Sequence, residues 1–66
     1  MNNYQKNEIV YVMQAPQINT IYEPVKSGMI LKAENKRVLV QFAANAVYWV
    51  DVQYISRTDP RKASKG

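Results

Sequence analysis

Apolar and polar residues alternate through most of this chain with a period of two, which is the period of a β-strand. The clearest run is 36–42, in which three large apolar side chains share one face. The other runs are also rich in β-branched and aromatic residues, which are typical of strands. Together these patterns predict five strands, at residues 8–13, 25–33, 36–42, 46–50 and 55–57.

The segments between these strands contain residues that favour turns. Residues 14–24 include two prolines and mixed polarity, which predict a long loop. Residues 34–35 predict a tight turn, and 43–45 predict a short connection. Asp51 is expected to be the N-cap of a single helical turn before the last strand. Gly28, inside the second strand, predicts a bulge or a sharp bend.

Five short strands in about fifty residues are too few for a sandwich of two sheets, so we expect an all-β fold that closes into one small barrel. The barrel is predicted over residues 7–57, with a flexible N-terminus at 1–6 and a disordered basic tail at 58–66. We expect replacement of Trp49 by alanine to cost about 3–5 kcal/mol, as for a core residue. The predicted core consists of Val10, Val12, Ile30, Val38, Val40, Phe42, Trp49 and Ile55.

Three segments carry a resemblance to a known class of fold. Residues 7–12 read NEIVYV, residues 28–30 read GMI and are followed by RVLVQF at 37–42, and residues 49–55 read WVDVQYI. In this order they resemble the opening strand, the bent hairpin and the closing segment of SH3-like small β-barrels of the Tudor/KOW type. The resemblance implies a five-stranded SH3-like barrel. Such barrels bind peptides, methylated lysines, RNA or DNA, or serve as accessory subunits, so the fold does not select a function.

The chain departs from the peptide-binding members of that class. Those members carry several tyrosines in the first loop and a pair of tryptophans at the start of the third strand. Here the loop contains Tyr22 alone, and Lys36 and Arg37 occupy the position of the tryptophan pair. Tyr54 does lie in the helical turn, where such proteins often have a tyrosine in their binding groove. Tyr22 and Tyr54 are therefore the residues that match the peptide-binding pattern.

Composition excludes several kinds of chemistry. The 66 residues include no cysteine and no histidine, which removes disulfides, thiolate catalysis and the commonest general base and metal ligand. The carboxylates are scattered, and no glycine-rich phosphate loop is present. We therefore expect a non-catalytic protein without a metal or cofactor. The sequence has no apolar run of signal-peptide or membrane-spanning length, so a cytoplasmic protein without a membrane partner is expected.

The net charge of +4 is concentrated at the C-terminus. Residues 57–66 contain four basic residues and one acidic residue, whereas residues 1–56 contain five basic and four acidic residues. Short basic tails add contacts to phosphate, although they also simply keep small domains soluble.

The distribution of cations and tyrosines predicts a nucleic-acid-associated regulatory or accessory factor. Basic residues flank the turn at 34–35, and Tyr11 and Tyr48 are predicted to lie on the face opposite the core, where aromatic rings stack on bases. The same pattern is also typical of a solvated hairpin end and of tyrosines that fill strand positions. The predicted nucleic-acid-binding residues are Lys26, Lys32, Lys36, Arg37, Tyr11, Tyr48, Arg57, Arg61 and Lys62.

The alternative is a protein-interaction module that docks on an enzyme or a transcription complex, or associates with itself as a homo-oligomer. It is favoured by the near-neutral charge of the predicted barrel and by apolar residues expected on its surface, such as Met29 and Leu39. The predicted protein-interaction residues are Tyr22, Leu39, Tyr48 and Tyr54. A basic surface that includes tyrosines favours nucleic acid, and an apolar, uncharged surface favours a protein partner.

Overall fold

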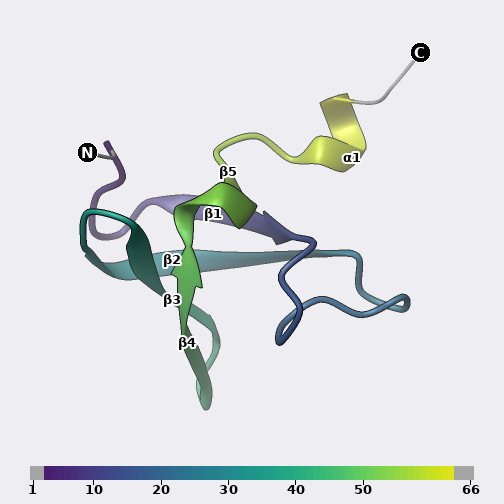
Figure 1. Ribbon diagram of the computed structural model, residues 1–66, viewed down its shortest axis with the longest axis horizontal. Helices are drawn as coiled ribbons and strands as arrows, with labels where there is room; N and C mark the ends of the chain where they lie inside the picture. Colours follow the sequence, from purple (N-terminus) through teal and green to yellow (C-terminus); the bar gives the residue numbers. More distant parts are fainter. Residues whose placement is uncertain (1–2, 64–66) are drawn as a thin grey trace.

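The computed structural model describes residues 3–63, and its regular secondary structure is mainly β-strand, with only two short helical segments (Figure 1). The all-β class and the five predicted strands are confirmed, and each strand boundary lies within one residue of the predicted one. The elements are β1 (Ile9–Met13), β2 (Val25–Ala33), β3 (Arg37–Ala43), β4 (Ala46–Asp51), the 3-10 helix η1 (Val52–Tyr54), β5 (Ile55–Ser56) and the four-residue helix α1 (Pro60–Ala63).

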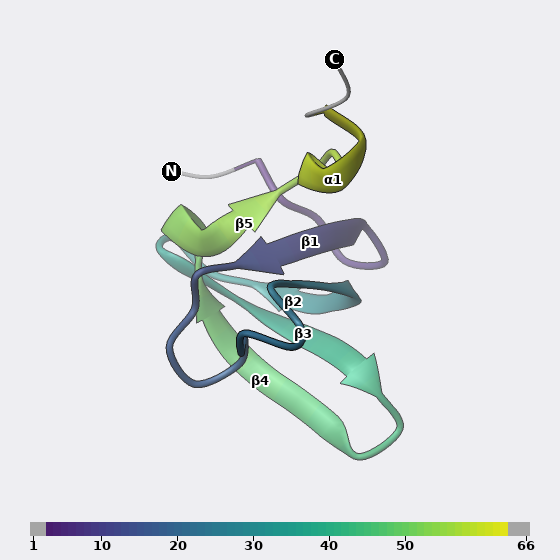
Figure 2. The same cartoon turned by 90° about the vertical axis from the view of Figure 1, so that its right-hand side faces the viewer.

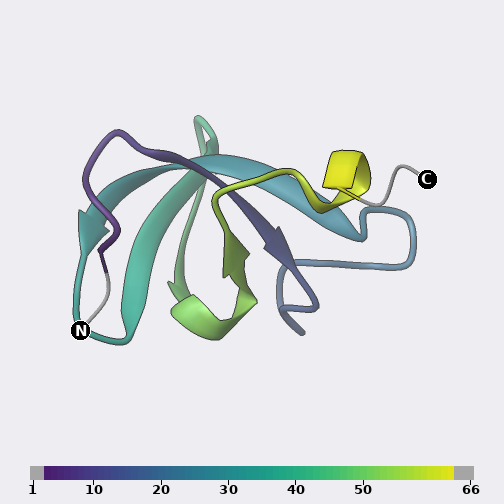
Figure 3. The ribbon, with the colours of Figure 1, turned by 90° about the horizontal axis from the view of Figure 1, so that it is seen from above.

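The five strands form one antiparallel sheet in the order β4-β3-β2-β1-β5, which Figure 2 shows from one end to the other. β2 is the central strand. Residues 25–29 of β2 pair with β1, and residues 29–33 pair with β3, while the strand arches between the two halves of the sheet (Figure 3). The chain is compact, with a Cα radius of gyration of 11.3 Å. β4 and β5 remain the two edges, so the sheet is not closed and the predicted barrel is not confirmed.

The hydrophobic core lies on the concave side of this curved sheet. Five of the eight predicted core residues are fully buried there, and Phe42 and Ile55 are partly buried against them. Ala15, from the loop after β1, completes the core because the loop folds back over it. The buried residues are Val10, Val12, Ala15, Ile30, Val38, Val40 and Val50.

The prediction that Trp49 is a core residue is wrong. Its side chain is 38% exposed, and the neighbouring Val50 is buried in its place. The cause is a shift of the β3–β4 register at Phe42, between the pairs Ala43–Ala46 and Gln41–Val47. Without that extra residue, Trp49 would lie opposite Val40 and face the core. The bulge moves the register by one residue, and a shift of one residue exchanges the two faces of a strand.

Gly28 does not form the predicted bulge. It lies opposite Val10 in a regular part of the β1–β2 pairing, and β2 is irregular three residues later, between Ile30 and Lys32. Glycine is required at position 28 by close packing instead. A Cβ atom there would lie 2.6 Å from Val40 Cγ1 and 2.8 Å from the carbonyl oxygen of Gln41. The missing side chain lets β3 pack closely against the arch of β2.

The segments before β1 and after β5 contact each other. The Tyr4 hydroxyl donates a hydrogen bond to the carbonyl oxygen of Ile55 (3.3 Å), and the Arg57 guanidinium lies 4.2 Å from the centre of the Tyr4 ring. Arg57 Nε also donates to a carboxylate oxygen of Glu8. The flexibility proposed for 1–6 and the disorder proposed for 58–66 stay predictions, and residues 1–2 and 64–66 lie outside the described residues.

Glu8 makes the stability of the fold depend on pH. A hydrogen bond from the Gln5 backbone N–H and another from Arg57 hold the pKa of Glu8 below its ordinary value of 4.5. A carboxyl whose pKa is lower in the folded state stabilises the fold above its unfolded pKa. That stabilisation is lost as the pH falls through the folded pKa. We expect the urea midpoint to fall between about pH 6 and pH 3, and to fall less in Glu8→Gln. An equal fall in both proteins would contradict this role of Glu8.

Candidate binding surfaces

An apolar patch covers the convex side of the sheet, opposite the core. The strand pairing aligns Ile9 with Met29, Met29 with Gln41, and Gln41 with Val47 in one row across four strands. The next row aligns Lys32 with Leu39, and Leu39 with Trp49. Side chains on one face of adjacent strands contact one another, so these rows form a continuous surface. We call the apolar members the outer-face patch: Ile9, Met29, Leu39, Val47 and Trp49.

The outer-face patch is open to solvent at its two sides. Ile9 is 52% exposed on β1, and Val47 and Trp49 are each 38% exposed on β4, while Met29 and Leu39 are half-buried between them. Large apolar side chains exposed singly are ordinary, but a contiguous group across four strands is typical of an interaction site.

Arg37 orients the indole of Trp49 within the patch. The guanidinium carbon lies 4.1 Å from the centre of the Trp49 ring, in a cation–π contact. Arg37 Nε also donates a hydrogen bond to Glu34 Oε1 at 2.8 Å, which holds the guanidinium in place. Lys32 and Lys36 are exposed near this end of β3 without an ion pair among residues 3–63. One border of the apolar patch is therefore basic.

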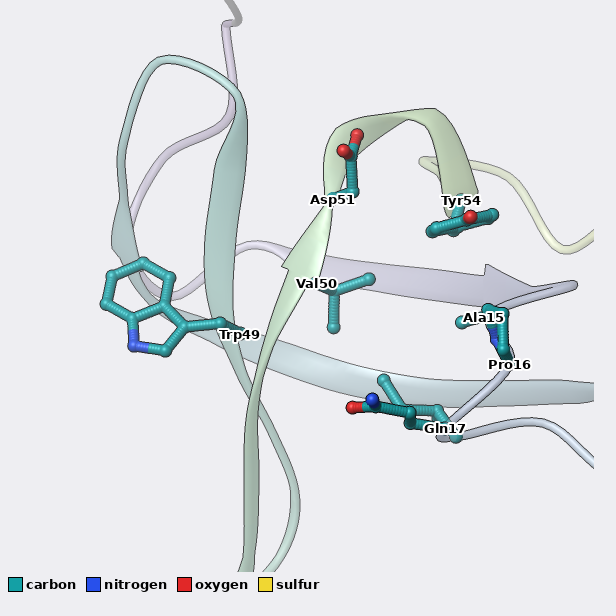
Figure 4. Close-up of a pocket in the computed structure, with 8 residues that line it drawn as sticks. Ala15, Pro16, Gln17, Trp49, Val50, Asp51 and Tyr54 are labelled. Atoms are coloured by element: carbon teal, nitrogen blue, oxygen red, sulfur yellow. The ribbon is translucent and has the colours of Figure 1, made fainter.

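A groove of about 180 Å³ lies on the other side of β4. Its walls are the loop residues 15–18, the end of β4 and Tyr54 of η1 (Figure 4). Val50 points toward these walls in Figure 4, whereas the Trp49 indole points away from them. The predicted N-cap is confirmed here, because the Asp51 carboxylate accepts a hydrogen bond from the Gln53 backbone N–H at 3.0 Å. This cap begins the helical turn that carries Tyr54 to the groove.

Asn19 fixes the loop that forms one wall of the groove. Its side-chain oxygen accepts a hydrogen bond from the Ala15 N–H at 2.9 Å. Its amide nitrogen donates to the carbonyl oxygens of Val12 (3.0 Å) and Glu23 (3.3 Å). One side chain thus joins the start, the middle and the end of the loop. The loop presents Tyr22, which is 87% exposed, to solvent at its tip.

The structure does not gather the predicted nucleic-acid-binding residues on one surface. Four of the cations form ion pairs, of Lys26 with Glu23, Arg37 with Glu34, Arg57 with Glu8 and Arg61 with Asp59. The Arg61 hydrogen bonds hold the pKa of Asp59 below its ordinary value of 3.8. Lys26 lies 5.9 Å from the Phe42 ring on the concave side, near the opposite end of β2 from Lys32, which is aligned with Leu39 of the outer-face patch. Lys62 lies in α1, beyond the sheet.

The prediction that Tyr11 and Tyr48 share a face is wrong. Tyr11 lies between the buried residues Val10 and Val12, so it occupies the convex face. Tyr48 pairs with the buried Val40, so it lies on the concave side, where it is partly exposed and its ring is 6.2 Å from that of Phe42. The same register shift that moves Trp49 outward moves Tyr48 inward.

The predicted protein-interaction residues also occupy separate places. Leu39 belongs to the outer-face patch, and Tyr54 lines the groove. Tyr22 is at the loop tip, and Tyr48 contacts Phe42. Sequence reasoning missed Val47 and Trp49 as surface residues, because four large apolar side chains follow one another in residues 47–50 and either face could be the buried one.

Comparison of the chain with models of protein families, with curated proteins and with solved structures finds no match. Within residues 3–63, no helix is long and apolar enough to cross a membrane. The same part of the chain contains no group of three or more acidic side chains placed to hold a metal ion.

Proposed function

We propose that this protein is a non-catalytic protein-interaction module and that the outer-face patch is its binding surface. The observation that carries the proposal is the alignment of five apolar side chains across four strands, with Trp49 held in place by Arg37. Tryptophan residues held rigidly in apolar surroundings are common anchors of protein interfaces. The exposed Lys32, aligned with Leu39 at one border of the patch, favours a partner surface that is apolar at its centre and acidic at that side.

Nucleic-acid binding has less support from the arrangement of the side chains. A protein that tracks a phosphate backbone needs several cations free to contact it along one surface. Here most of the predicted cations pair with carboxylates, and one face of the Trp49 ring is already covered by Arg37. We therefore place nucleic acid second, with Lys32, Lys36 and Trp49 as its contact residues.

We also propose that the fold is an open form of the SH3-like small barrel of the Tudor/KOW type. Two features support this. The long central β2 pairs with β1 in its first half and with β3 in its second half. A short helical turn separates β4 from β5, and β5 then pairs with β1 at Tyr11 and Val12.

Peptides selected for binding to this protein are expected to depend on Trp49. Selection from a random peptide library on the immobilised protein should recover peptides with apolar and acidic residues. Trp49→Ala should weaken the binding of these peptides at least about tenfold, as loss of an interface anchor does. Fluorescence polarisation would measure the affinities. Circular dichroism would check that the variant is folded, as expected for a side chain outside the core.

The matched control is Tyr22→Ala, which removes an exposed aromatic ring outside the outer-face patch and should leave peptide affinity unchanged. A single-stranded oligonucleotide would be tested in parallel at low and high salt. Equal peptide binding by Trp49→Ala and the wild type would refute the proposed surface. Oligonucleotide binding with a steep salt dependence, in the absence of any selected peptide, would establish nucleic acid as the ligand.

A further inference from the structure

The outer edge of β4 is a strand edge without a partner in the described structure. β4 is the last strand of the sheet over six residues, whereas the opposite edge, β5, has two residues. Exposed edges are usually protected by proline, by lysine or by an extra bend. Residues 46–51 contain neither proline nor lysine, and the only charged side chain among them is Asp51 at the end.

The register identifies which backbone groups face this free edge. The Val52 N–H donates to the carbonyl oxygen of Lys36 at 3.0 Å, which makes this a hydrogen-bonded pair. Hydrogen-bonded and non-hydrogen-bonded pairs alternate in an antiparallel ladder, so Val50 and Tyr48 also direct their backbone groups toward β3. The N–H and C=O groups of Val47 and Trp49 therefore point away from β3, toward the open edge.

We propose that β4 pairs with β4 of a second copy of this chain, antiparallel and about a two-fold axis at Tyr48. In this register Val47 lies opposite Trp49 of the second copy, and Trp49 lies opposite its Val47. Each of these pairs exchanges two backbone hydrogen bonds, so the free N–H and C=O groups of Val47 and Trp49 are satisfied in both strands. On the convex side each valine contacts an indole, and on the concave side the two Tyr48 rings meet across the axis as a cross-strand aromatic pair.

The groove beside β4 lies where one end of the second copy's strand would pack. It borders the end of β4 at Trp49, Val50 and Asp51, so one end of an added strand lies in or beside it. In the proposed register, Asn45 of the second copy faces Asp51 and Ala46 faces Val50. The segment Ala43-Ala44-Asn45-Ala46 that reaches the groove consists of small residues.

Charge does not oppose this pairing, although the whole chain is basic. The two Asp51 carboxylates lie at opposite ends of the strand pair, about 20 Å apart along it. Lys32 and Arg37 belong to β2 and β3, which are behind β4 relative to the shared edge. The dimer joins two outer-face patches into one convex surface, but Tyr48 is outside the patch, so the pairing and the proposed function are separable.

Opposite charges at position 48 test the symmetry of the pairing. In the wild type, sedimentation should show a reversible dimer as the concentration rises toward about 1 mM. Tyr48→Lys and Tyr48→Glu should each be monomeric, because like charges then face each other across the axis. An equimolar mixture of the two should recover the dimer. Ile21→Lys, at the exposed loop tip, is the control and should dimerise as the wild type does.

Amide exchange in the wild type tests the same pairing without a substitution, which matters if the Tyr48 variants do not fold. The amides of Val47 and Trp49 should become at least about tenfold more protected at high protein concentration, while that of Ile21 does not change. Monomeric wild type with unchanged exchange at Val47 and Trp49 would overturn the proposal. Protection of these two amides by a selected peptide, in a protein that stays monomeric, would also overturn it, since the edge would then bind a foreign strand.

Discussion

Replacing Ile30 with alanine is expected to lower the free energy of unfolding by about 2–5 kcal/mol. Ile30 is the largest of the fully buried side chains, and it lies where β2 passes from its pairing with β1 to its pairing with β3. Truncation would leave a cavity between the two halves of the sheet, and close-packed valines around it cannot refill that space. A protein of this length has a total stability of only about 3–10 kcal/mol, so the variant would be largely unfolded or close to it.

Urea denaturation followed by far-ultraviolet circular dichroism would measure this loss. Ile9→Ala is the matched control, because it removes the same atoms from a side chain that is more than half exposed on the convex face. We expect the control to change stability by less than about 1 kcal/mol. Comparable losses in the two variants would mean that the core does not lie on the concave side of the sheet.

The positions of the strands were predictable because successive side chains of a pleated strand point to opposite faces, so apolar and polar residues alternate along it. The strand over 25–33 agrees with the sequence pattern at both ends, and the helical turn begins at the cap that Asp51 predicted. Both features depend on local rules. A valine-rich run favours an extended backbone whichever strand it pairs with. A capping carboxylate accepts a hydrogen bond from a backbone N–H only two or three residues further along the chain.

The faces of β4 were not predictable in the same way, because they depend on the register against β3. The alternation assigns Val38 and Val40 to the core without ambiguity, but Val47, Tyr48, Trp49 and Val50 suit either face. The bulge at Phe42 determines which face of β4 is buried, and the residue types around Phe42 do not predict a bulge there. The candidate binding surface follows from that register: Leu39 was predicted to be exposed, but its neighbour Trp49 was assigned to the wrong side.

Whether the sheet closes into a barrel could not be predicted from the alternation of residues, for a related reason. Alternation shows that a strand has a buried face, but it does not show whether the last strand reaches the first. In this protein β4 and β5 follow each other along the chain and still form opposite edges of the sheet, separated by η1. The unpaired edge of β4 is what the predicted barrel would have removed, and it is the basis of the proposed dimer.

Replacing Gly28 with alanine is expected to destabilise the protein by about 1–3 kcal/mol, as an extra methyl group does in a well-packed core. The new Cβ would approach Val40 Cγ1 to 2.6 Å and Phe42 Cδ1 to 3.0 Å, and these side chains have limited room to move. The contact of 2.8 Å with the carbonyl oxygen of Gln41 is more serious, because that atom belongs to the backbone of β3. Relief would require β3 to move away from β2 next to the bulge at Phe42.

The sign of the stability change in Gly28→Ala is informative because the substitution also has a stabilising effect, which acts on the unfolded chain. Alanine restricts the unfolded chain more than glycine, which by itself would stabilise the protein by about 0.4–1 kcal/mol where the backbone is compatible. Gly28 has no positive φ angle, so its backbone suits alanine and only the close packing opposes the substitution. Ser27→Ala, at the adjacent exposed position, is the control in urea denaturation. If Gly28→Ala proved as stable as the wild type, β3 would not pack against the arch of β2 as closely as described. The position of the Phe42 bulge would then lose its support, and so would the outward orientation of Trp49, which depends on that bulge.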